Sequence, residues 1–338
     1  MAVKKVVERK GESHCRLIVE PDEGTAPVVE LIDGATRSLR VKQFTLTDSA
    51  VMSALIRAHQ RHVEVRIMLN PHRSSGDRAN DESFKALRQA GLKVEWSNPA
   101  FAVTHEKSIV FDDATALIST FNLATKYFTE TRDYGIVTTN PTQVAQVLEC
   151  FEADWHRKPF EPDPDSGLLW SSNNSRHIMA WFIDTAEKEL IIQHPKFVDA
   201  TIVERIATAR KRGVKVRLLC GGRHGISEWD VLDTFASLRL LDRFGVKVRR
   251  QKHLKLHAKL LIVDGERAQI GSMNIDRSAF DLRRELGVVT EERAIIKGLR
   301  KIFEQDWNEA KPYEAPDPLQ PDKHHEGELP HDPHFLHE

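Results

Sequence analysis

The chain has 338 residues and a formal net charge of −1, which is enough length for two domains with separate cores. Its cysteines (Cys15, Cys150 and Cys220) form no CxxC pair and are too few for a disulfide framework, which favours a reducing compartment. No apolar run approaches ~18 residues, and none follows the basic start, so the sequence predicts neither a transmembrane helix nor a signal peptide.

Strands and helices are predicted to alternate from residue 16 onward. RLIVE (16–20) is expected to be a strand, a helix is expected from about Asp48 to His59, and VEVRIML (63–69) is the next strand. In the second half, a helix is expected from about Ala200 to Arg212, followed by the strand VKVRLLC (214–220). Alternation with short loops is typical of βαβ units and of a parallel or mixed sheet.

Two segments carry the same polar pattern, H-x-K, then D, then a hydroxyl residue two positions before Asn. In the second segment, the Asp264-Gly265 turn is expected to join two short strands into a hairpin. Residues two apart share a face of a strand, so an imidazole, an ammonium, a hydroxyl and a carboxamide would converge. These groups suit a phosphate ligand. The polar positions are His105, Lys107, Asp112, Thr120 and Asn122 in the first segment, and His257, Lys259, Asp264, Ser272 and Asn274 in the second.

The second segment repeats the first at a constant offset of 152 residues. The same offset relates Arg132-Asp133 to Arg284-Glu285 and Asp154-Trp155 to Asp306-Trp307. A solvated basic hairpin would be the simplest interpretation of one copy alone. Five polar positions that recur at one offset instead indicate two versions of one domain in tandem.

The two motifs resemble the phospholipase D superfamily, whose signature occurs twice per active site. The resemblance covers about residues 16–312 and is greatest to bacterial phospholipases D and cardiolipin synthases. It implies an α/β fold of two tandem domains, each a mixed β-sheet flanked by helices, related by a pseudo-twofold axis with the active site at their interface. One departure is Ser119-Thr120 in place of Gly-Ser, where Ser119 adds a side chain near the expected phosphate.

The expected boundaries are an N-terminal segment at 1–15, a first domain at 16–160, a linker at 161–174, a second domain at 175–312 and a tail at 313–338. The tail is rich in Pro, His and acidic residues and has no period, so we expect it to be disordered. Its seven acids and one lysine give −6, which leaves +5 on the rest of the chain. A mildly basic body suits anionic substrates without selecting one.

Two histidines and a phosphodiester imply covalent catalysis. The resemblance implies that His105 attacks phosphorus and forms a phosphohistidine, while His257 acts as acid and then as base. The sequence by itself does not order the two histidines. A lysine in each motif takes the place that a cation would fill, so no metal and no cofactor is expected.

The remaining motif residues have supporting roles in this hypothesis. The non-bridging oxygens would be held by the motif lysines and by the hydroxyl and amide side chains, which are Thr120, Asn122, Ser272 and Asn274. Asp133 and Glu285 each follow a motif Asn by 11 residues and are expected to accept an N–H from a histidine. Asp112 and Asp264 are expected to cap their hairpins.

The leading functional hypothesis is hydrolysis of phospholipids or phosphatidyl transfer, because fused motif pairs are usual in lipid-acting relatives. A single chain would then complete the active site without dimerising, in the cytoplasm or peripheral to the membrane. One alternative is a metal-independent nuclease, favoured by the basic run from Lys247 to Lys259. A second alternative is a degenerate phosphate-binding module, motivated by Ser119.

Overall fold

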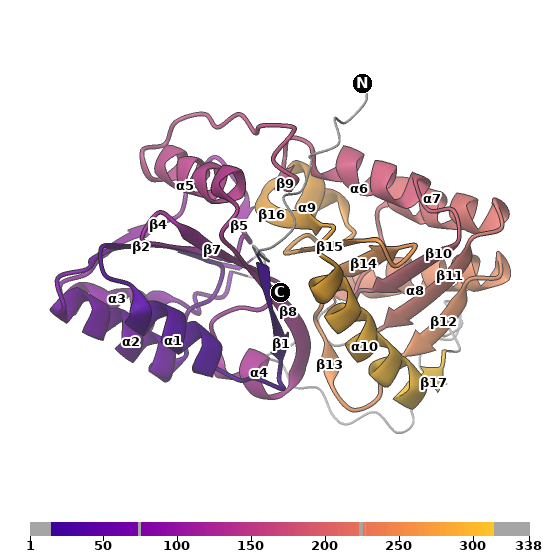
Figure 1. The fold of residues 1–338 in the computed structure, drawn as a ribbon, viewed down its shortest axis with the longest axis horizontal. Coiled ribbons are helices and arrows are strands. Elements are labelled where there is room, and N and C mark those ends of the chain that lie inside the picture. The colour runs from indigo at the N-terminus through magenta and orange to yellow at the C-terminus, as the bar shows by residue number, and fades with distance from the viewer. Residues whose placement is uncertain (1–14, 74–75, 223–225, 227, 314–338) are drawn as a thin grey trace.

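A computed structural model describes residues 15–73, 76–222, 226 and 228–313, with no side-chain description at 228 and 229. The expected N-terminal segment, apart from Cys15, and the tail beyond Tyr313 lie outside these residues. Two α/β halves lie side by side, and the chain colours divide cleanly between them (Figure 1). The predicted fold class is confirmed, since each half is a mixed sheet flanked by helices.

The first sheet has the strand order β1-β8-β7-β6-β2-β3-β4 among the described residues. Strands β2, β3 and β4 are parallel and joined by helices, whereas β6, β7, β8 and β1 run antiparallel. The elements of this half are β1 (Cys15–Glu20), α1 (Ala26–Gly34), β2 (Ser38–Gln43), α2 (Ser49–Gln60), β3 (Glu64–Leu69), α3 (Asp81–Gln89), β4 (Lys93–Trp96), β5 (Val103–Thr104), β6 (Ser108–Phe111), β7 (Thr115–Ser119), α4 (Thr125–Thr129), β8 (Thr131–Thr138) and α5 (Pro141–Trp155).

The second sheet has the order β17-β12-β11-β10-β14-β15-β16-β5 among the described residues, and β9 also pairs with β16. The antiparallel β14–β15 hairpin forms across Asp264-Gly265, as predicted. The elements are β9 (Leu168–Ser171), α6 (Ser175–Asp184), β10 (Glu189–Gln193), α7 (Ala200–Lys211), β11 (Lys215–Cys220), α8 (Glu228–Arg243), β12 (Lys247–Arg250), β13 (Lys255–Leu256), β14 (Leu260–Val263), β15 (Arg267–Gly271), α9 (Arg277–Asp281), β16 (Arg283–Thr290), α10 (Arg293–Glu309) and β17 (Lys311–Pro312).

Local sequence explains where the paired helices α2 and α7 begin. Asp48 precedes α2, and its carboxylate accepts hydrogen bonds from the backbone N–H groups of Ala50 and Val51. Asp199 caps α7 in the same way, on Ile202 N–H. Such caps satisfy N–H groups that have no partner within the helix. Both helices therefore start at the residues the sequence predicted.

Each half contributes a short strand to the other half's sheet. β5, from the first half, pairs in parallel with β16 in the second sheet. β13, from the second half, pairs in parallel with β8 in the first sheet. In addition, β9 lies within the segment that was expected to be a linker, 161–174, and pairs antiparallel with β16. The two halves are therefore joined by backbone hydrogen bonds as well as by the connecting chain.

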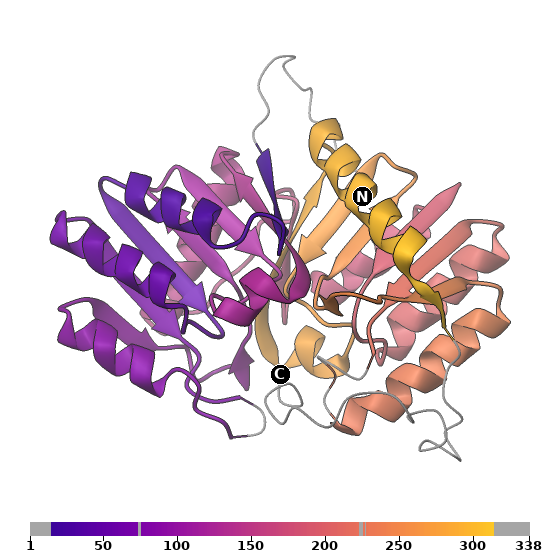
Figure 2. The ribbon, with the colours of Figure 1, turned by 90° about the horizontal axis from the view of Figure 1, so that it is seen from below.

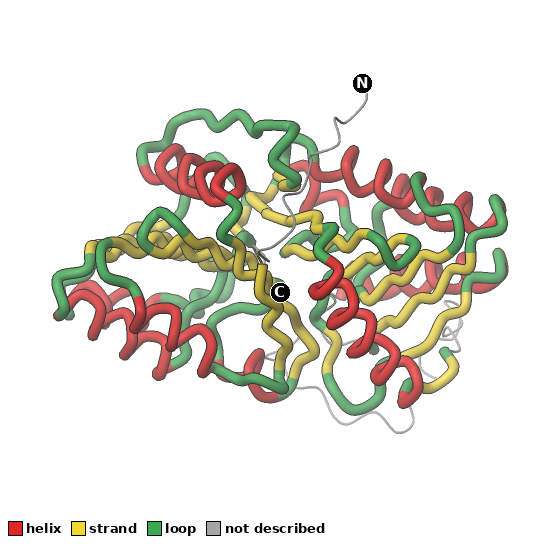
Figure 3. The backbone as a smooth tube through the Cα atoms, viewed as in Figure 1, coloured by secondary structure: helices red, strands yellow, loops and turns green. Residues whose placement is uncertain are grey.

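Three hydrophobic clusters account for most of the core. One lies between the first sheet and α1–α3, and a second lies between the second sheet and α6–α8. The third joins side chains from both sheets with α5 and α10, for example Ile118, Val147, Ile270 and Phe303. Figure 2 shows α1–α3 and α6–α8 toward the outer sides, and in Figure 3 the strands of both sheets approach the centre. The shared cluster fixes the two sheets against each other.

The motif aspartates have a structural role that differs in detail from hairpin capping. Asp112 accepts from the backbone N–H groups of Thr36, Arg37 and Ser38, just before β2. Asp264 does the same for residues 187–189 before β10. Each carboxylate thus ties the turn of its own hairpin to the start of a neighbouring strand, and these hydrogen bonds lower the pKa of both groups against the effect of burial.

Candidate active site

The exchanged strands bring each motif histidine to the other half's carboxylate. His105 follows β5, and its backbone N–H donates to Arg284 O at 2.9 Å. His257 follows β13, and its N–H donates to Arg132 O at 3.2 Å. The residue after each of these arginines is the carboxylate expected to hold a histidine. The pairing therefore crosses between halves, with His105 on Glu285 and His257 on Asp133.

The His105 ring is fully buried, and a carboxylate of the other half holds one of its two nitrogens. Its Nδ1 lies 2.9 and 3.1 Å from the two carboxylate oxygens of Glu285, and Phe44 packs edge-on against the ring at 4.7 Å. Among the described residues, no group hydrogen-bonds to His105 Nε2. Burial, followed by the charge of Lys107, holds the pKa of His105 well below its usual range. The imidazole is therefore neutral, with Nε2 available as a nucleophile or acceptor.

His257 has partners at both ring nitrogens. Nδ1 lies 2.7 Å from Asp133 Oδ1, and Nε2 lies 2.9 Å from the ammonium of Lys259. Burial lowers the pKa of His257 to about 3, although Asp133 opposes that shift. Tyr127 packs against the ring at 4.8 Å. His257 and Lys259 also contribute to the lowered pKa of His105, so the two motifs share one electrostatic environment.

The two carboxylates are not equivalent. Asp133 accepts hydrogen bonds from the hydroxyls of Thr120 (2.5 Å) and Thr131 (2.6 Å). Burial favours its neutral form, but His257 and Lys259 outweigh burial and lower the pKa of Asp133. Burial instead raises the pKa of Glu285 to about 7, only partly opposed by Lys107. A full negative charge therefore faces His257, and a weaker one faces His105.

The motif lysines reach back to their own histidines. Lys107 Nζ donates to His105 O, and Lys259 Nζ donates to His257 O, both at 2.8 Å. Both ammonium groups are almost completely buried. Burial, followed by the charge of Lys107, holds the pKa of Lys259 well below its usual range. An anion bound between these lysines would relieve their mutual repulsion.

The amide and hydroxyl side chains of the motifs have different surroundings. Both polar atoms of the Asn122 carboxamide, and Asn274 Oδ1, are buried and have no hydrogen-bond partner in the described part of the chain. The hydroxyls expected on the phosphate are already engaged. Thr120 donates to Asp133, and Ser272 Oγ lies 3.3 Å from Leu286 O. Within the described residues, the two carboxamides thus keep open hydrogen-bonding capacity, whereas the two hydroxyls are engaged by other protein groups.

The Ser119 departure is accommodated locally. A Cβ added at Gly271, its counterpart, would lie 2.6 Å from Gly287 Cα and 2.7 Å from Leu286 O, so the second motif requires glycine there. In the first motif, the Ser119 side chain has room, and its hydroxyl donates to Phe121 O at 3.0 Å. Ser119 therefore leaves the first hairpin intact.

Two buried ion pairs between the halves frame the site, and sequence reasoning did not identify them. Arg284 contacts both carboxylate oxygens of Asp154 at 3.0 Å. Arg132 likewise reaches Asp306, at 2.9 and 3.2 Å. All four residues belong to the blocks that repeat at 152. The sequence showed that these blocks repeat, but it did not show that each arginine pairs with the aspartate of the other half.

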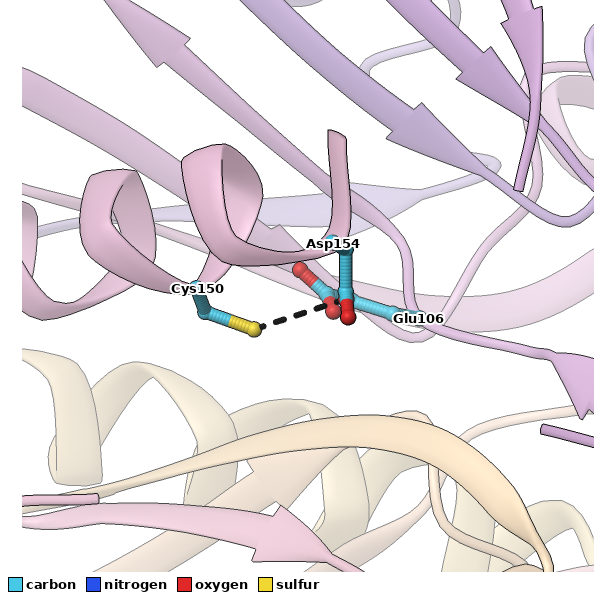
Figure 4. A group of neighbouring side chains, drawn as sticks. All are labelled: Glu106, Cys150 and Asp154. Carbon is cyan, nitrogen blue, oxygen red and sulfur yellow. Dashed lines mark hydrogen bonds between the residues drawn. The ribbon is translucent and has the colours of Figure 1, made fainter. Parts of the chain in front are cut away.

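A three-residue group beside this ion pair could at first suggest a metal site. Glu106, Cys150 and Asp154 place one potential ligand atom each within 4.8 Å of one another (Figure 4). The Lys42 ammonium already lies there, 3.0 Å from Glu106, 2.8 Å from Asp154 and 3.4 Å from Cys150 Sγ. Burial opposes the charge of Lys42, but Asp154 outweighs it and raises the pKa. A lysine thus supplies the positive charge of this group.

The basic run before His257 is partly neutralised. Lys255 forms an ion pair with Glu130 at 2.9 Å, and the Arg249 guanidinium lies 4.8 Å from the Trp307 ring centre. Both interactions hold these side chains against the protein. The run therefore offers less free positive charge than the sequence suggested.

A comparison with models of protein families shows the family of this chain. The family model described as "Cardiolipin synthase, PLD-like domain" matches residues 28–155 and again residues 179–307. The chain belongs to this PLD-like family. The two matches enclose both motifs and both histidine-binding carboxylates.

Relatives within the PLD-like family are distant in sequence. Cardiolipin synthase 1 of Staphylococcus epidermidis is 26% identical over 77% of this chain and 60% of its own length. Cardiolipin synthase A of Pseudomonas entomophila is 24% identical over 89% of this chain and 70% of its own length. The chain therefore spans less than two thirds of the first of these relatives.

A solved structure shares the PLD-like fold over most of both chains. Phosphatidylserine synthase of Haemophilus influenzae Rd KW20 superimposes with a TM-score of 0.71 at 16% identity, over 87% of this chain and 86% of its own. At this identity, the likeness concerns the fold. Among the described residues of the present chain, no helix is long and apolar enough to cross a membrane.

Proposed function

We propose that this chain is a metal-independent phosphodiesterase that acts through a phosphohistidine on His105, with phospholipids as substrates. The observation that carries the proposal is the buried His105 ring, whose Nδ1 is held by Glu285 and whose Nε2 has no partner among the described residues. The unpartnered atoms of Asn122 and Asn274 extend the same argument, because buried polar groups are normally hydrogen-bonded.

In the first step, the lone pair of His105 Nε2 attacks phosphorus in line. The N–P bond forms while the bond from phosphorus to the leaving oxygen breaks. His257, protonated at Nε2, gives its proton to that oxygen, and the alcohol departs. The positive charge on the phosphorylated His105 ring is balanced by Glu285 at Nδ1.

In the second step, neutral His257 removes a proton from water or from an acceptor alcohol. The oxygen attacks phosphorus, the N–P bond breaks, and His105 returns to its neutral form. Water completes hydrolysis, whereas an alcohol completes transfer. One pocket therefore supports both reactions, and the relative access of water and alcohol decides between them.

The asymmetry of the carboxylates supports this division of roles. Asp133 stays ionised and stabilises an imidazolium at His257, as an acid and base requires. Glu285, whose pKa is raised to about 7, orients His105 with less charge and so suits a neutral nucleophile. Burial lowers the pKa of His257 to about 3, but a bound phosphate anion would raise that pKa and draw Lys259 away from Nε2.

Three observations favour a phospholipid over a nucleic acid. The family model and the two relatives described above carry the name cardiolipin synthase. Both motifs lie in one chain, and in the basic run the charge of Lys255 is paired with Glu130. The reaction that we propose is therefore phosphatidyl transfer at a membrane surface.

The test uses phosphatidylglycerol vesicles and, separately, single-stranded DNA, both in EDTA. Release of glycerol or formation of a new phosphatidyl product, without DNA cleavage, is the expected outcome. DNA cleavage without lipid turnover would replace the proposal with a nuclease. Loss of lipid turnover in EDTA would refute metal independence, and inactivity on both substrates would leave a phosphate-binding module.

A further inference from the structure

A cavity with a volume of about 560 Å³ lies at the outer edge of the second half. Figure 1 shows the place, where β12 and β17 lie beside the end of α10. Its lining combines basic side chains with one aromatic ring. The residues concerned are Lys215, Arg217, Lys247, Arg249 and Trp307.

Strand geometry gathers the basic side chains of the cavity on one face of the sheet. Lys215 and Arg217 are two residues apart on β11, and Lys247 and Arg249 are two apart on β12, so each pair shares a face. The parallel register sets Arg217 beside Lys247, which brings both pairs to the same face. This face meets α10, because Arg217 forms an ion pair with Glu304 of that helix.

The cavity lies at the opposite end of the sheet from the catalytic histidines. Lys215 pairs with Glu189 at the beginning of β10. Leu260, the residue after Lys259, pairs with Gln193 at the end of β10. Four residues of strand separate these two positions, which is about 13 Å. The cavity is therefore distinct from the pocket that contains the motifs.

Arg217 is held in place but keeps a donor that no described residue uses. Its terminal nitrogens lie 2.7 and 2.6 Å from the two carboxylate oxygens of Glu304. Arg217 is 7% exposed, and its Nε is buried without a hydrogen-bond partner among the described residues. Buried N–H groups are normally hydrogen-bonded, so this one has capacity for a ligand.

Trp307 fixes two guanidinium groups on the wall of the cavity. The Cζ atoms of Arg217 and Arg249 lie 5.5 and 4.8 Å from the centre of its ring. Arg249 also donates to Trp307 O at 2.8 Å. Such contacts favour a cation over the aromatic face and leave its charge in place. The positive charge of this wall is thus preorganised.

The corresponding positions of the first half are balanced in charge. There, Glu64 lies 2.8 Å from Arg40 and 3.5 Å from Lys93. Formal charges at four aligned positions sum to zero in the first half and to +4 in the second, where Glu189 and Glu304 offset part of the excess. The aligned residues are Glu64, Arg66, Lys93 and Glu95 in β3 and β4, and Lys215, Arg217, Lys247 and Arg249 in β11 and β12.

The chemistry of the cavity selects an anion with several acceptor oxygens. Ammonium and guanidinium groups donate hydrogen bonds and accept none. Phosphate oxygens accept several charge-assisted hydrogen bonds at once, which suits donors that converge from two strands. The Trp307 ring adds an apolar surface for carbon atoms attached to the phosphate.

We propose that the cavity beside Trp307 binds a phosphate-bearing anion at a site separate from the catalytic pocket. This site is independent of the proposed function, since none of its residues takes part in the chemical steps. The phosphate belongs either to a lipid head group or to a free phosphate in solution, and binding measurements distinguish the two.

The experiment follows the indole N–H signal of Trp307 in ¹⁵N-labelled protein. Its loss in Trp307→Phe identifies the signal. The ligands are inorganic phosphate, dihexanoyl phosphatidic acid and, as a zwitterionic control, dihexanoyl phosphatidylcholine, each added at constant ionic strength. We expect a saturable shift with the anions. Saturation by inorganic phosphate at least as readily as by phosphatidic acid assigns a free phosphate, and tighter binding of phosphatidic acid assigns a lipid head group.

Lys247→Gln should weaken the binding about fivefold, equivalent to one lost hydrogen bond, and addition of Lys215→Gln should weaken it further. Lys93→Gln is the matched control, because it removes the lysine at the aligned position of the first half. This variant should bind as the wild type does.

The absence of a saturable Trp307 shift with both anions overturns the proposed site. An equal shift with phosphatidylcholine overturns the selection of an anion. Binding that Lys247→Gln leaves unchanged, or that Lys93→Gln weakens equally, overturns the assignment to this cavity. Because the readout is local to Trp307, the result holds whether or not the protein turns over phosphodiesters.

Discussion

Replacing Asp133 by Asn should separate the two chemical steps. The substitution preserves shape but removes the negative charge that lies 2.7 Å from His257 Nδ1. In the proposed mechanism, His257 carries a positive charge whenever it holds the proton of the reacting oxygen. The variant should therefore fail in each step that requires His257 to transfer a proton.

The size of the expected effect follows from the 2.7 Å distance between Asp133 and His257 Nδ1. Two unit charges about 3 Å apart attract by about 5 kcal/mol at an effective dielectric constant near 20. The dipole of the introduced carboxamide and the hydroxyls of Thr120 and Thr131 retain part of this stabilisation. We expect a loss of about 3–5 kcal/mol, or roughly 10²–10⁴-fold in a step that needs proton transfer.

Rapid-mixing kinetics with bis(p-nitrophenyl) phosphate provide the assay. p-Nitrophenolate leaves without protonation, so attack by His105 should survive in Asp133→Asn. Breakdown of the phosphoenzyme still requires the base. The variant should therefore release a burst of p-nitrophenol close to one equivalent of enzyme, followed by turnover slowed by the factor above.

The matched variant is Glu285→Gln, at the symmetry-related position. In the proposed mechanism, Glu285 orients the nucleophile, so burst and steady-state rates should fall together in this variant. An Asp133→Asn variant whose burst rate falls as much as its steady-state turnover would refute the assignment of His257 as acid and base. A burst with slow turnover in Glu285→Gln alone would also refute it and would reverse the roles of the histidines.

The remaining predictions concern trapping, stability and pH. His257→Asn should accumulate labelled phosphate on His105, detected by mass spectrometry of peptides; label in a variant that lacks His105 would contradict this. Arg132→Ala should lower the free energy of urea unfolding by about 3–5 kcal/mol, because it removes the guanidinium that pairs with the buried Asp306 carboxylate. Arg57→Ala, which breaks an exposed ion pair with Asp33, should change the free energy of unfolding much less. Equal losses would argue against the interface role. Burial raises the pKa of Glu20 to about 9. Above pH ~4.5 the unfolded chain loses this proton while the folded chain keeps it, so the fold becomes progressively less stable as the pH rises. Glu20→Gln should therefore raise Tm far more at pH 8 than at pH 5, and a pH-independent difference would contradict this prediction.

The sequence predicted most of the fold because local features determine it. Asp48 and Asp199 mark helix starts, Asp264-Gly265 marks a hairpin turn, and the 152-residue offset defines the duplication. It also identified Asp133 and Glu285, since a regular spacing links each of them to a motif. These properties require only neighbouring residues or a constant offset.

Other features depend on how the halves meet, which no spacing specifies. An offset of 152 cannot show that Glu285 binds His105 rather than His257, because both carboxylates have equivalent positions in their own half. For the same reason, the sequence did not predict the ion pair of Arg284 with Asp154.

The reciprocal strand exchange has an evolutionary consequence. A symmetric dimer of one short chain would duplicate every substitution, so each change at one wall of its pocket would reappear opposite. Here a single gene encodes both walls, and each wall can vary while the other keeps its sequence. Ser119, at the position where the second half has Gly271, is one such difference between the two halves.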